Sequence, residues 1–78
     1  MLKIKDGVDL KELEKFGFDD LGVCYKKYAD FGVQFFVNKG TREIKRLHPY
    51  SLREEPSLSE VLDLDIDGLV EKVEEEYR

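Results

Sequence analysis

The stretch Phe31-Gly32-Val33-Gln34-Phe35-Phe36-Val37-Asn38 decides the fold of this chain. From Phe31 to Val37 an apolar residue recurs at every second position, which is the period of a β-strand with one buried face. Asn38-Lys39-Gly40 then supplies the residue types that favour a tight turn. The stretch therefore predicts a strand after which the chain reverses direction at residues 38–40.

Strand candidates flank this stretch on both sides. Residues 23–28 precede it, with Ala29-Asp30 as the expected turn, and residues 41–47 follow it. Three consecutive strands with tight connections predict an antiparallel meander. Residues 2–5 alternate between apolar and lysine side chains, which predicts a short strand or an extended arm and would provide a fourth strand.

Helical patterns lie before and after the predicted strands. Asp9 can cap a helix over residues 9–16, Glu12 has the capping-box spacing from it, and Gly17 is the expected stop. Ser57 and Glu60 repeat the capping-box spacing and predict a helical turn at 58–62. From Asp65 onward, apolar residues at helical spacing predict an amphipathic C-terminal helix: Ile66, Leu69, Val70, Val73 and Tyr77.

These patterns predict an α+β fold. The expected architecture is a three- to four-stranded antiparallel meander packed against an N-terminal helix and a C-terminal amphipathic helix. A length of 78 residues leaves room for one core, so residues 1–78 are expected to form a single small domain. A domain of this size buries a modest share of its surface, which leaves a homodimer open.

The composition indicates a cellular compartment for the chain and argues against a membrane-spanning helix and an export signal. The single cysteine, Cys24, excludes an intrachain disulfide and fits a reducing, cytoplasmic setting. No unbroken apolar run exceeds three residues, so no membrane-spanning helix is expected. Residues 1–6 are charged and contain no apolar signal core, so export is not expected either.

The net charge of −5 is unevenly spread along the chain. Residues 1–53 carry 11 cationic and 8 acidic side chains, whereas residues 54–78 carry 2 and 10. An acidic protein repels phosphate, so nucleic acid is not the expected partner. The acidic C-terminal third is either a solvated helix face or a surface for a basic partner.

One motif in that acidic third points to a metal site. Asp63-Leu64-Asp65-Ile66-Asp67-Gly68, followed by Glu74, fits the ligand spacing of an EF-hand-like calcium loop over residues 63–74. Pro56 leaves little room for an entering helix, and a second loop to pair with is absent. The competing interpretation is that the aspartates cap a helix and interact with its dipole. No cofactor or metal is therefore expected.

A second alternative is weak binding of single-stranded nucleic acid through the basic strand 39–46. Cations and aromatic rings on one sheet face could neutralise phosphates and stack bases. The opposing interpretation is that the cations only solvate the open face of the sheet. The residues concerned are Lys39, Arg42, Lys45, Arg46 and Arg53, together with Tyr25, Tyr28 and Phe36.

The sequence shows no constellation that indicates catalysis. Cys24 and His48 are each the only residue of their type, and nothing local marks the cysteine as activated. Cys24 is expected to be a small buried residue and His48 a loop residue. No glycine-rich phosphate loop and no Ser–His–Asp pattern is present, so the chain is predicted not to be an enzyme.

Phe36 points away from the other apolar residues of its strand. Either a helix covers it, or it lies exposed with Tyr25 or Tyr28 nearby and suits a protein partner or a dimer seam. The predicted contact regions are therefore the aromatic side of the sheet and the acidic face of the last helix. The candidate residues are Tyr25, Phe36, Glu71, Glu74 and Glu75.

As a whole, the chain resembles small uncharacterised proteins of Gram-positive (Firmicutes) phages and other mobile elements. The resemblance rests on Val8-Asp9-Leu10-Lys11-Glu12-Leu13-Glu14-Lys15-Phe16-Gly17-Phe18, on the aromatic strands, and on Leu69-Val70-Glu71-Lys72-Val73. It implies an intracellular accessory role with a host or phage protein as partner. The expected function is a non-enzymatic protein-interaction module of a mobile element.

Overall fold

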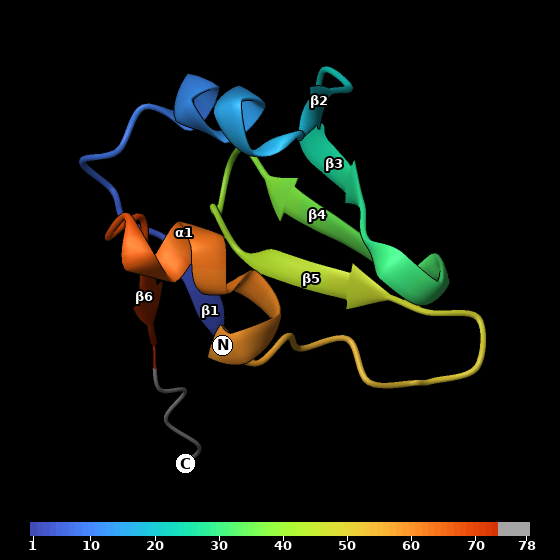
Figure 1. Ribbon diagram of the computed structural model, residues 1–78. Coiled ribbons are helices and arrows are strands. Elements are labelled where there is room, and N and C mark those ends of the chain that lie inside the picture. Colours follow the sequence, from blue (N-terminus) through green and yellow to red (C-terminus); the bar gives the residue numbers. More distant parts are fainter. Residues whose placement is uncertain (74–78) are drawn as a thin grey trace, which may run out of the picture.

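The computed structural model describes residues 1–73 of the chain. These residues form β-strands, an α-helix and 3₁₀ helices, so the α+β class is confirmed. The elements, in chain order (Figure 1), are β1 (Leu2–Ile4), the 3₁₀ helix η1 (Leu10–Phe16), β2 (Asp19–Asp20), β3 (Cys24–Tyr28), the 3₁₀ turn η2 (Asp30–Gly32), β4 (Gln34–Asn38), β5 (Ile44–Leu47), the 3₁₀ helix η3 (Leu58–Val61), α1 (Leu62–Ile66) and β6 (Val70–Lys72).

Strands β2 to β5 form a four-stranded antiparallel sheet in the order of the chain. Tyr25 of β3 lies opposite Val37 of β4, which lies opposite Ile44 of β5, and all three side chains are buried. The fourth strand of this sheet is β2. The N-terminal strand, which the sequence offered as the fourth member, instead pairs with β6 in a separate two-stranded sheet.

The predicted C-terminal helix is wrong. The helix α1 ends at Ile66, and Gly68 has a positive φ of 74°, a conformation that glycine adopts without steric cost. The Leu69 amide donates to the Leu64 carbonyl at 3.0 Å, which closes the end of the helix. The chain then runs as β6 beside β1, where Val70 lies opposite Ile4. Tyr77 lies outside the described residues.

The helix predicted at residues 9–16 is present as the 3₁₀ helix η1. The Asp9 carboxylate accepts from the Lys11 amide at 3.0 Å, and Gly17 ends the helix with a φ of 89°. Leu13 is its fully buried residue and anchors η1 to the core. The turn predicted at 58–62 is also present as η3, with the Glu60 carboxylate accepting from the Ser57 amide at 3.0 Å.

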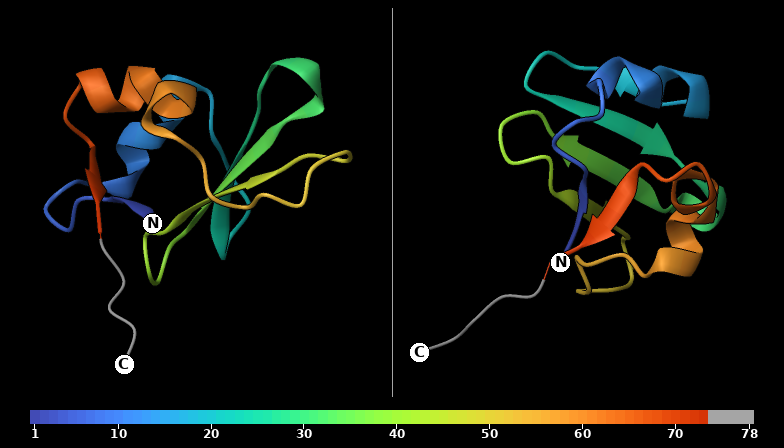
Figure 2. Two further views of the ribbon diagram at one scale, coloured as in Figure 1. Left: turned by 90° about the horizontal axis from the view of Figure 1, so that it is seen from below. Right: turned by 90° about the vertical axis from the view of Figure 1, so that its left-hand side faces the viewer.

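The core lies between the four-stranded sheet and the other elements. Figure 2 shows, in its left view, the helices and the β1–β6 pair on the same side of that sheet. The second face of the sheet is therefore left without a covering element among residues 1–73. The helices of this described part are too short and too polar to cross a membrane. The buried apolar residues are Leu2, Ile4, Leu13, Phe18, Tyr25, Phe35, Val37, Ile44, Val61, Leu64 and Val70.

Candidate protein-interaction surface

The uncovered face of the sheet carries Phe36 but not Tyr25. Because side chains alternate along a strand, Tyr25 and Phe36 point to opposite faces, and Tyr25 is only 2% exposed in the core. The predicted aromatic surface that combined these two rings is therefore wrong. Phe36 is half-buried and lies in register between Lys26 and Lys45, and the Lys26 ammonium lies 5.7 Å from the centre of its ring.

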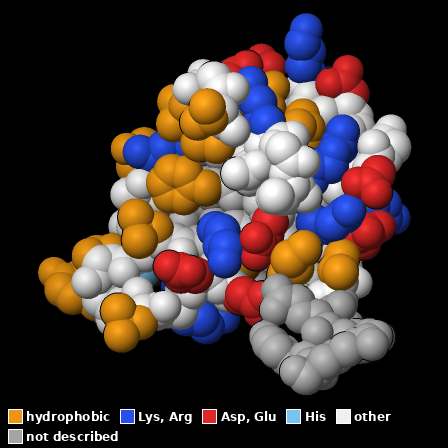
Figure 3. Space-filling model, turned by 180° about the vertical axis from the view of Figure 1, so that it is seen from behind, with side chains coloured by type: hydrophobic (Ala, Val, Ile, Leu, Met, Phe, Trp, Pro, Cys, Tyr) orange, Lys and Arg blue, Asp and Glu red, His pale blue; other side chains and the backbone are white. Residues whose placement is uncertain are grey.

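Exposed apolar side chains instead gather at one end of the sheet, where β3 and β5 finish and β4 begins. Phe31, Tyr50 and Leu52 have exposed fractions of 93%, 91% and 101%. Tyr28 and Leu47 lie beside them in one cross-strand row with Gln34 between them. Figure 3 shows hydrophobic side chains at the lower left, the end that carries η2 and the loop after β5. We call Tyr28, Phe31, Leu47, Tyr50 and Leu52 the apolar end.

Phe31 occupies the turn between β3 and β4 rather than the strand in which its spacing placed it. Its φ of 62° is positive, and a bulky residue in this left-handed region is strained. The turn is closed by the Ala29 amide, which donates to the Val33 carbonyl at 2.7 Å. The strain is thus imposed by a tight connection, and it projects an aromatic ring into solvent.

His48 joins the Phe31 turn to the loop after β5. Its Nε2 lies 3.1 Å from the Phe31 carbonyl oxygen, and its Nδ1 lies 3.1 Å from the Tyr50 amide nitrogen. A carbonyl only accepts and an amide only donates, so the ring is assigned as neutral with its proton on Nε2. The His48 ring also contacts the Tyr50 ring edge-on, with centroids 5.7 Å apart. Both loops are therefore held by one imidazole.

Arg46 attaches the rest of the loop after β5, residues 51–54, to the sheet. Its side chain is 8% exposed, and Nη1 donates to the Ser51 hydroxyl at 3.4 Å and to the Arg53 carbonyl at 3.2 Å. The Arg46 amide also donates to the Glu54 carbonyl at 2.7 Å. The loop that exposes Tyr50 and Leu52 is consequently attached to the sheet by backbone and side-chain bonds. Their exposure is a feature of a fixed loop.

Glu60 supplies the counter-charge for Arg46. The Arg46 Nε lies 3.1 Å from a Glu60 carboxylate oxygen without an aligned hydrogen bond, so the contact is an ion pair. Arg53 reaches the second oxygen at 2.7 Å. Burial alone raises the pKa of Glu60, but hydrogen bonds from Ser57 and Arg53 and the charge of Arg46 lower it below its ordinary value. The carboxylate therefore stays ionised and anchors η3 to the sheet.

Arg42 has the same kind of backbone strain as Phe31, but its side chain has a structural role. It is the other non-glycine residue with a positive φ, 66°, among those described. Its guanidinium donates to the Lys5 carbonyl at 2.9 Å and to the Val8 carbonyl at 2.7 Å, which ties the N-terminal segment to the sheet. Phe31 has the same backbone strain, but its side chain is left almost wholly in solvent.

The predicted basic strip is not a free surface. Lys39 pairs with Asp20 at 2.6 Å, Lys45 with Glu43 at 3.3 Å, and Arg42 binds carbonyl oxygens. Arg46 and Arg53 share Glu60. Each cation of the strip therefore has an acceptor within the chain, with which a phosphate would have to compete.

The aspartates of the calcium motif lie on helix α1 and its end. Asp63 accepts from the Leu64 amide at 2.9 Å and lies 3.3 Å from the Lys27 ammonium. Residues 70–72 are extended, so the backbone does not wrap into a ligand loop. Among residues 1–73, no three His, Cys, Asp or Glu side chains are close enough to hold a metal ion. Glu74, the last expected ligand, lies outside the described residues.

The predicted acidic contact face is also rearranged. Glu71 is in β6 and not on a helix, and its carboxylate lies 3.9 Å from the Lys3 ammonium. Glu74 and Glu75 lie outside the described residues.

Cys24 is a free, half-buried cysteine at the start of β3. His48 follows the far end of β5, so the two residues do not form a pair.

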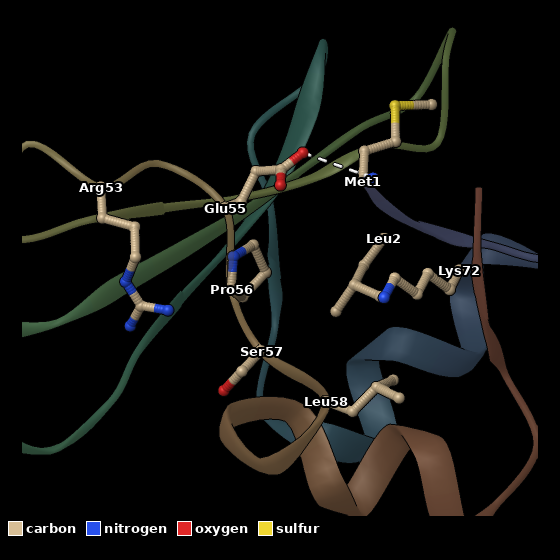
Figure 4. A pocket seen from close by; sticks show the side chains of 8 residues that line it. All are labelled: Met1, Leu2, Arg53, Glu55, Pro56, Ser57, Leu58 and Lys72. Atoms are coloured by element: carbon tan, nitrogen blue, oxygen red, sulfur yellow. Dashed lines mark ion pairs between the residues drawn. The ribbon is translucent and has the colours of Figure 1, made fainter. Parts of the chain in front are cut away.

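A hollow of about 410 Å³ lies beside the N-terminus (Figure 4). Its charged groups are largely satisfied: the Met1 ammonium lies 3.4 Å from Glu55, and Arg53 is held by Glu60. Its remaining lining is mainly apolar, from Leu2, Pro56 and Leu58. A smaller hollow of about 320 Å³ lies on the uncovered sheet face, lined by Phe36, Lys45, Arg46, Leu47 and Glu54.

Sequence reasoning missed Phe31, Tyr50 and Leu52 as surface residues. For Tyr50 and Leu52 a signal was present, since two large apolar residues occur in a segment with no helical or strand period. Apolar residues that no element can bury are exposed, and several together indicate an interaction surface. Comparisons of the chain with family models, with curated proteins and with solved structures find no match.

Proposed function

We propose that this chain is a non-enzymatic protein-interaction module and that the apolar end is its contact surface. Large apolar patches on small proteins commonly mark interaction sites, and exposed aromatic residues are the usual anchors of such contacts. The chain uses no cofactor in this proposal. Its antiparallel meander, with helices packed on one face, is the scaffold that holds the contact surface.

The observation that carries the proposal is the state of Phe31. Its backbone is strained, its ring is 93% exposed, and the turn around it is held by hydrogen bonds to Val33 and His48. Backbone strain persists where the surrounding structure enforces it, and such strain concentrates at functional sites. Removing an apolar ring from water is favourable, so the Phe31 ring contributes stabilising free energy only when a partner covers it.

The biological setting of the proposal rests on the resemblance alone. Residues 8–18 and 69–73 resemble small proteins of Gram-positive phages and mobile elements, which favours an accessory role in the cytoplasm, with a host or phage protein or a second copy of the chain as partner. The lone Cys24, free in the structure, fits a reducing compartment.

Site-specific photocrosslinking in Gram-positive cells tests the proposal. A benzophenone amino acid replaces Phe31 or Tyr50 in two variants, and Val23, which is 81% exposed at the other end of β3, in a control. The proposal expects discrete protein adducts from positions 31 and 50, which Leu52→Ser diminishes, and none from position 23. Absence of adducts at both positions, or equal adducts from all three, would contradict it.

A further inference from the structure

We infer that the occupant of the apolar end is a second copy of this chain, in a symmetric dimer. The inference deepens the proposed function and rests on it. In a two-fold dimer one surface meets itself, so it has to carry complementary features within a single patch. Shape, charge and area each bear on whether the apolar end does so.

The shape of this surface includes both a projection and a depression. Phe31 projects from the turn η2, and the hollow of about 320 Å³, with Phe36 and Leu47 in its lining, opens on the uncovered sheet face. Leu47 belongs to both features, because it lines the hollow and lies in the cross-strand row that ends at Tyr28. A two-fold axis through this region lets Phe31 of each copy approach the hollow of the other, above the ring of Phe36.

The charges around the apolar end are of both signs. Lys26 and Asp30 lie beside Tyr28 and Phe31, and neither forms an ion pair within residues 1–73. Lys45 and Glu54 line the hollow together. A partner of uniform charge would repel half of this rim, whereas a second copy offers Asp30 to Lys26 and the reverse at once.

The exposed area is of the size that a dimer needs. Phe31, Tyr50 and Tyr28, which are 93%, 91% and 66% exposed, can together bury roughly 400–600 Å², since a fully covered aromatic side chain buries about 150–250 Å². Leu47, Leu52 and the walls of the hollow extend this toward the roughly 800 Å² per partner of a standard interface. A chain of 78 residues also gains the buried surface that its small core lacks.

Sedimentation velocity of the wild-type chain over a concentration series tests the inference. We expect the mass to rise from 9.1 kDa to twice that value below about 1 mM. Tyr50→Ser and Leu52→Ser should each weaken the dimer at least tenfold, because both side chains are exposed and their loss leaves the core intact. The matched control Val23→Ser, at the other end of β3, should leave it unchanged.

A charge exchange tests the symmetric pairing itself. Lys26→Glu and Asp30→Lys should each weaken the dimer, and the double variant should recover most of the loss, because it restores opposite charges across the axis. Circular dichroism of each variant confirms that it is folded. A failure of the double variant to recover would overturn the proposed arrangement.

The outcomes separate this inference from the proposed function. A wild-type chain that stays at 9.1 kDa while position 31 crosslinks to a different protein overturns the dimer and leaves the interaction module standing. A monomer that gives no adducts contradicts both. Binding of the monomer to vesicles of phosphatidylcholine and phosphatidylglycerol, abolished by Leu52→Ser, would overturn the dimer in favour of a membrane surface.

Discussion

The imidazole of His48 lies between two loops and bonds to the backbone of each, with Nε2 3.1 Å from the Phe31 carbonyl oxygen and Nδ1 3.1 Å from the Tyr50 amide nitrogen. Residues 31 and 50 are among the most exposed apolar residues described, yet their backbones are tied together through this ring. The apolar end is therefore preorganised, which reduces the entropy that a partner has to remove on binding.

His48→Ala should loosen the loop after β5 without unfolding the chain. The variant removes the acceptor of the Tyr50 amide and the donor to the Phe31 carbonyl. A hydrogen bond of this kind contributes about 1 kcal/mol, so the Tyr50 amide should exchange about fivefold faster with solvent. Hydrogen exchange measured by NMR checks this, with the Val37 amide as an internal reference. Unchanged exchange at Tyr50 would show that the imidazole does not hold the loop.

Phe31→Gly should stabilise the monomer while it removes the proposed contact residue. Left-handed backbone costs a non-glycine residue roughly 1–2 kcal/mol, and glycine loses about 0.5–1 kcal/mol in chain entropy, so the net gain is about 0.5–1 kcal/mol. Urea denaturation at low protein concentration measures the change.

The matched control for that substitution is Arg42→Gly. It relieves the same positive φ but removes guanidinium bonds to the Lys5 and Val8 carbonyls, so it should destabilise by about 1–2 kcal/mol. Equal signs for the two variants would contradict the assignment of the Phe31 ring to binding and of the Arg42 side chain to structure.

Glu60→Ala should be among the most damaging substitutions outside the apolar core. It leaves the Arg46 guanidinium, 8% exposed, without its counter-charge. Removing one partner of a buried ion pair costs about 3–5 kcal/mol, and the partial exposure of Glu60, 24%, brings the expected loss to about 2–3 kcal/mol. Arg53→Ala, which removes the exposed partner of the same carboxylate, should cost less than about 1 kcal/mol. Chemical denaturation separates the two.

Acid should weaken the fold partly through the same carboxylate. The pKa of Glu60 in the folded chain lies below its ordinary value of 4.5, so the unfolded chain takes up the proton first as the pH falls. The stabilisation is complete above 4.5 and is lost as the pH falls through the folded pKa. Glu60→Gln should therefore flatten the acid limb of stability against pH, and parallel limbs for the two proteins would contradict this origin.

Gly68→Ala tests the point where helix gives way to strand. No atom lies within 4 Å of a methyl group added at Gly68, so the expected cost comes from its φ of 74° alone. The left-handed backbone costs a residue other than glycine about 1–2 kcal/mol, and the lower chain entropy of unfolded alanine offsets about 0.5–1 kcal/mol, so the expected net loss is about 0.5–1 kcal/mol. Gly7→Ala, at a glycine without positive φ and with the same open space, is the control and should stabilise by about 0.4–1 kcal/mol.

The pattern of the sequence located the central strand because burial alternates along it. Phe35 and Val37 are buried and Phe36 faces the other way, as their spacing indicates. Phe31 has the same parity but lies beyond the strand, and periodicity alone does not register that the chain turns at Gly32. Two hydrogen bonds close this turn, from the Ala29 amide to the Val33 carbonyl and from the Val33 amide to the Asp30 carbonyl, and they place Phe31 outside the strand.

The C-terminal segment shows the limit of periodicity more clearly. Ile66, Leu69 and Val70 have the spacing of one face of a helix. The same residues are equally compatible with a helix that ends at Ile66, a turn at Gly68 and a strand that begins at Val70. Val70 is buried opposite Ile4 and Ile66 is exposed, because β1 offers an unpaired strand edge that a helix would leave without hydrogen bonds. That competition involves residues far apart in sequence, which local patterns do not contain.

The pairing of β1 with β6 has a kinetic consequence. The Met1 ammonium and the Val73 carbonyl, bonded at 2.8 Å, are 72 positions apart, whereas β3, β4 and β5 are joined by short turns. Closing a long loop costs more entropy than closing a short one, so we expect the hairpins to form first and the β1–β6 pair last. Substitutions such as Ile4→Val should accordingly speed unfolding while leaving the folding rate nearly unchanged, which stopped-flow kinetics would reveal.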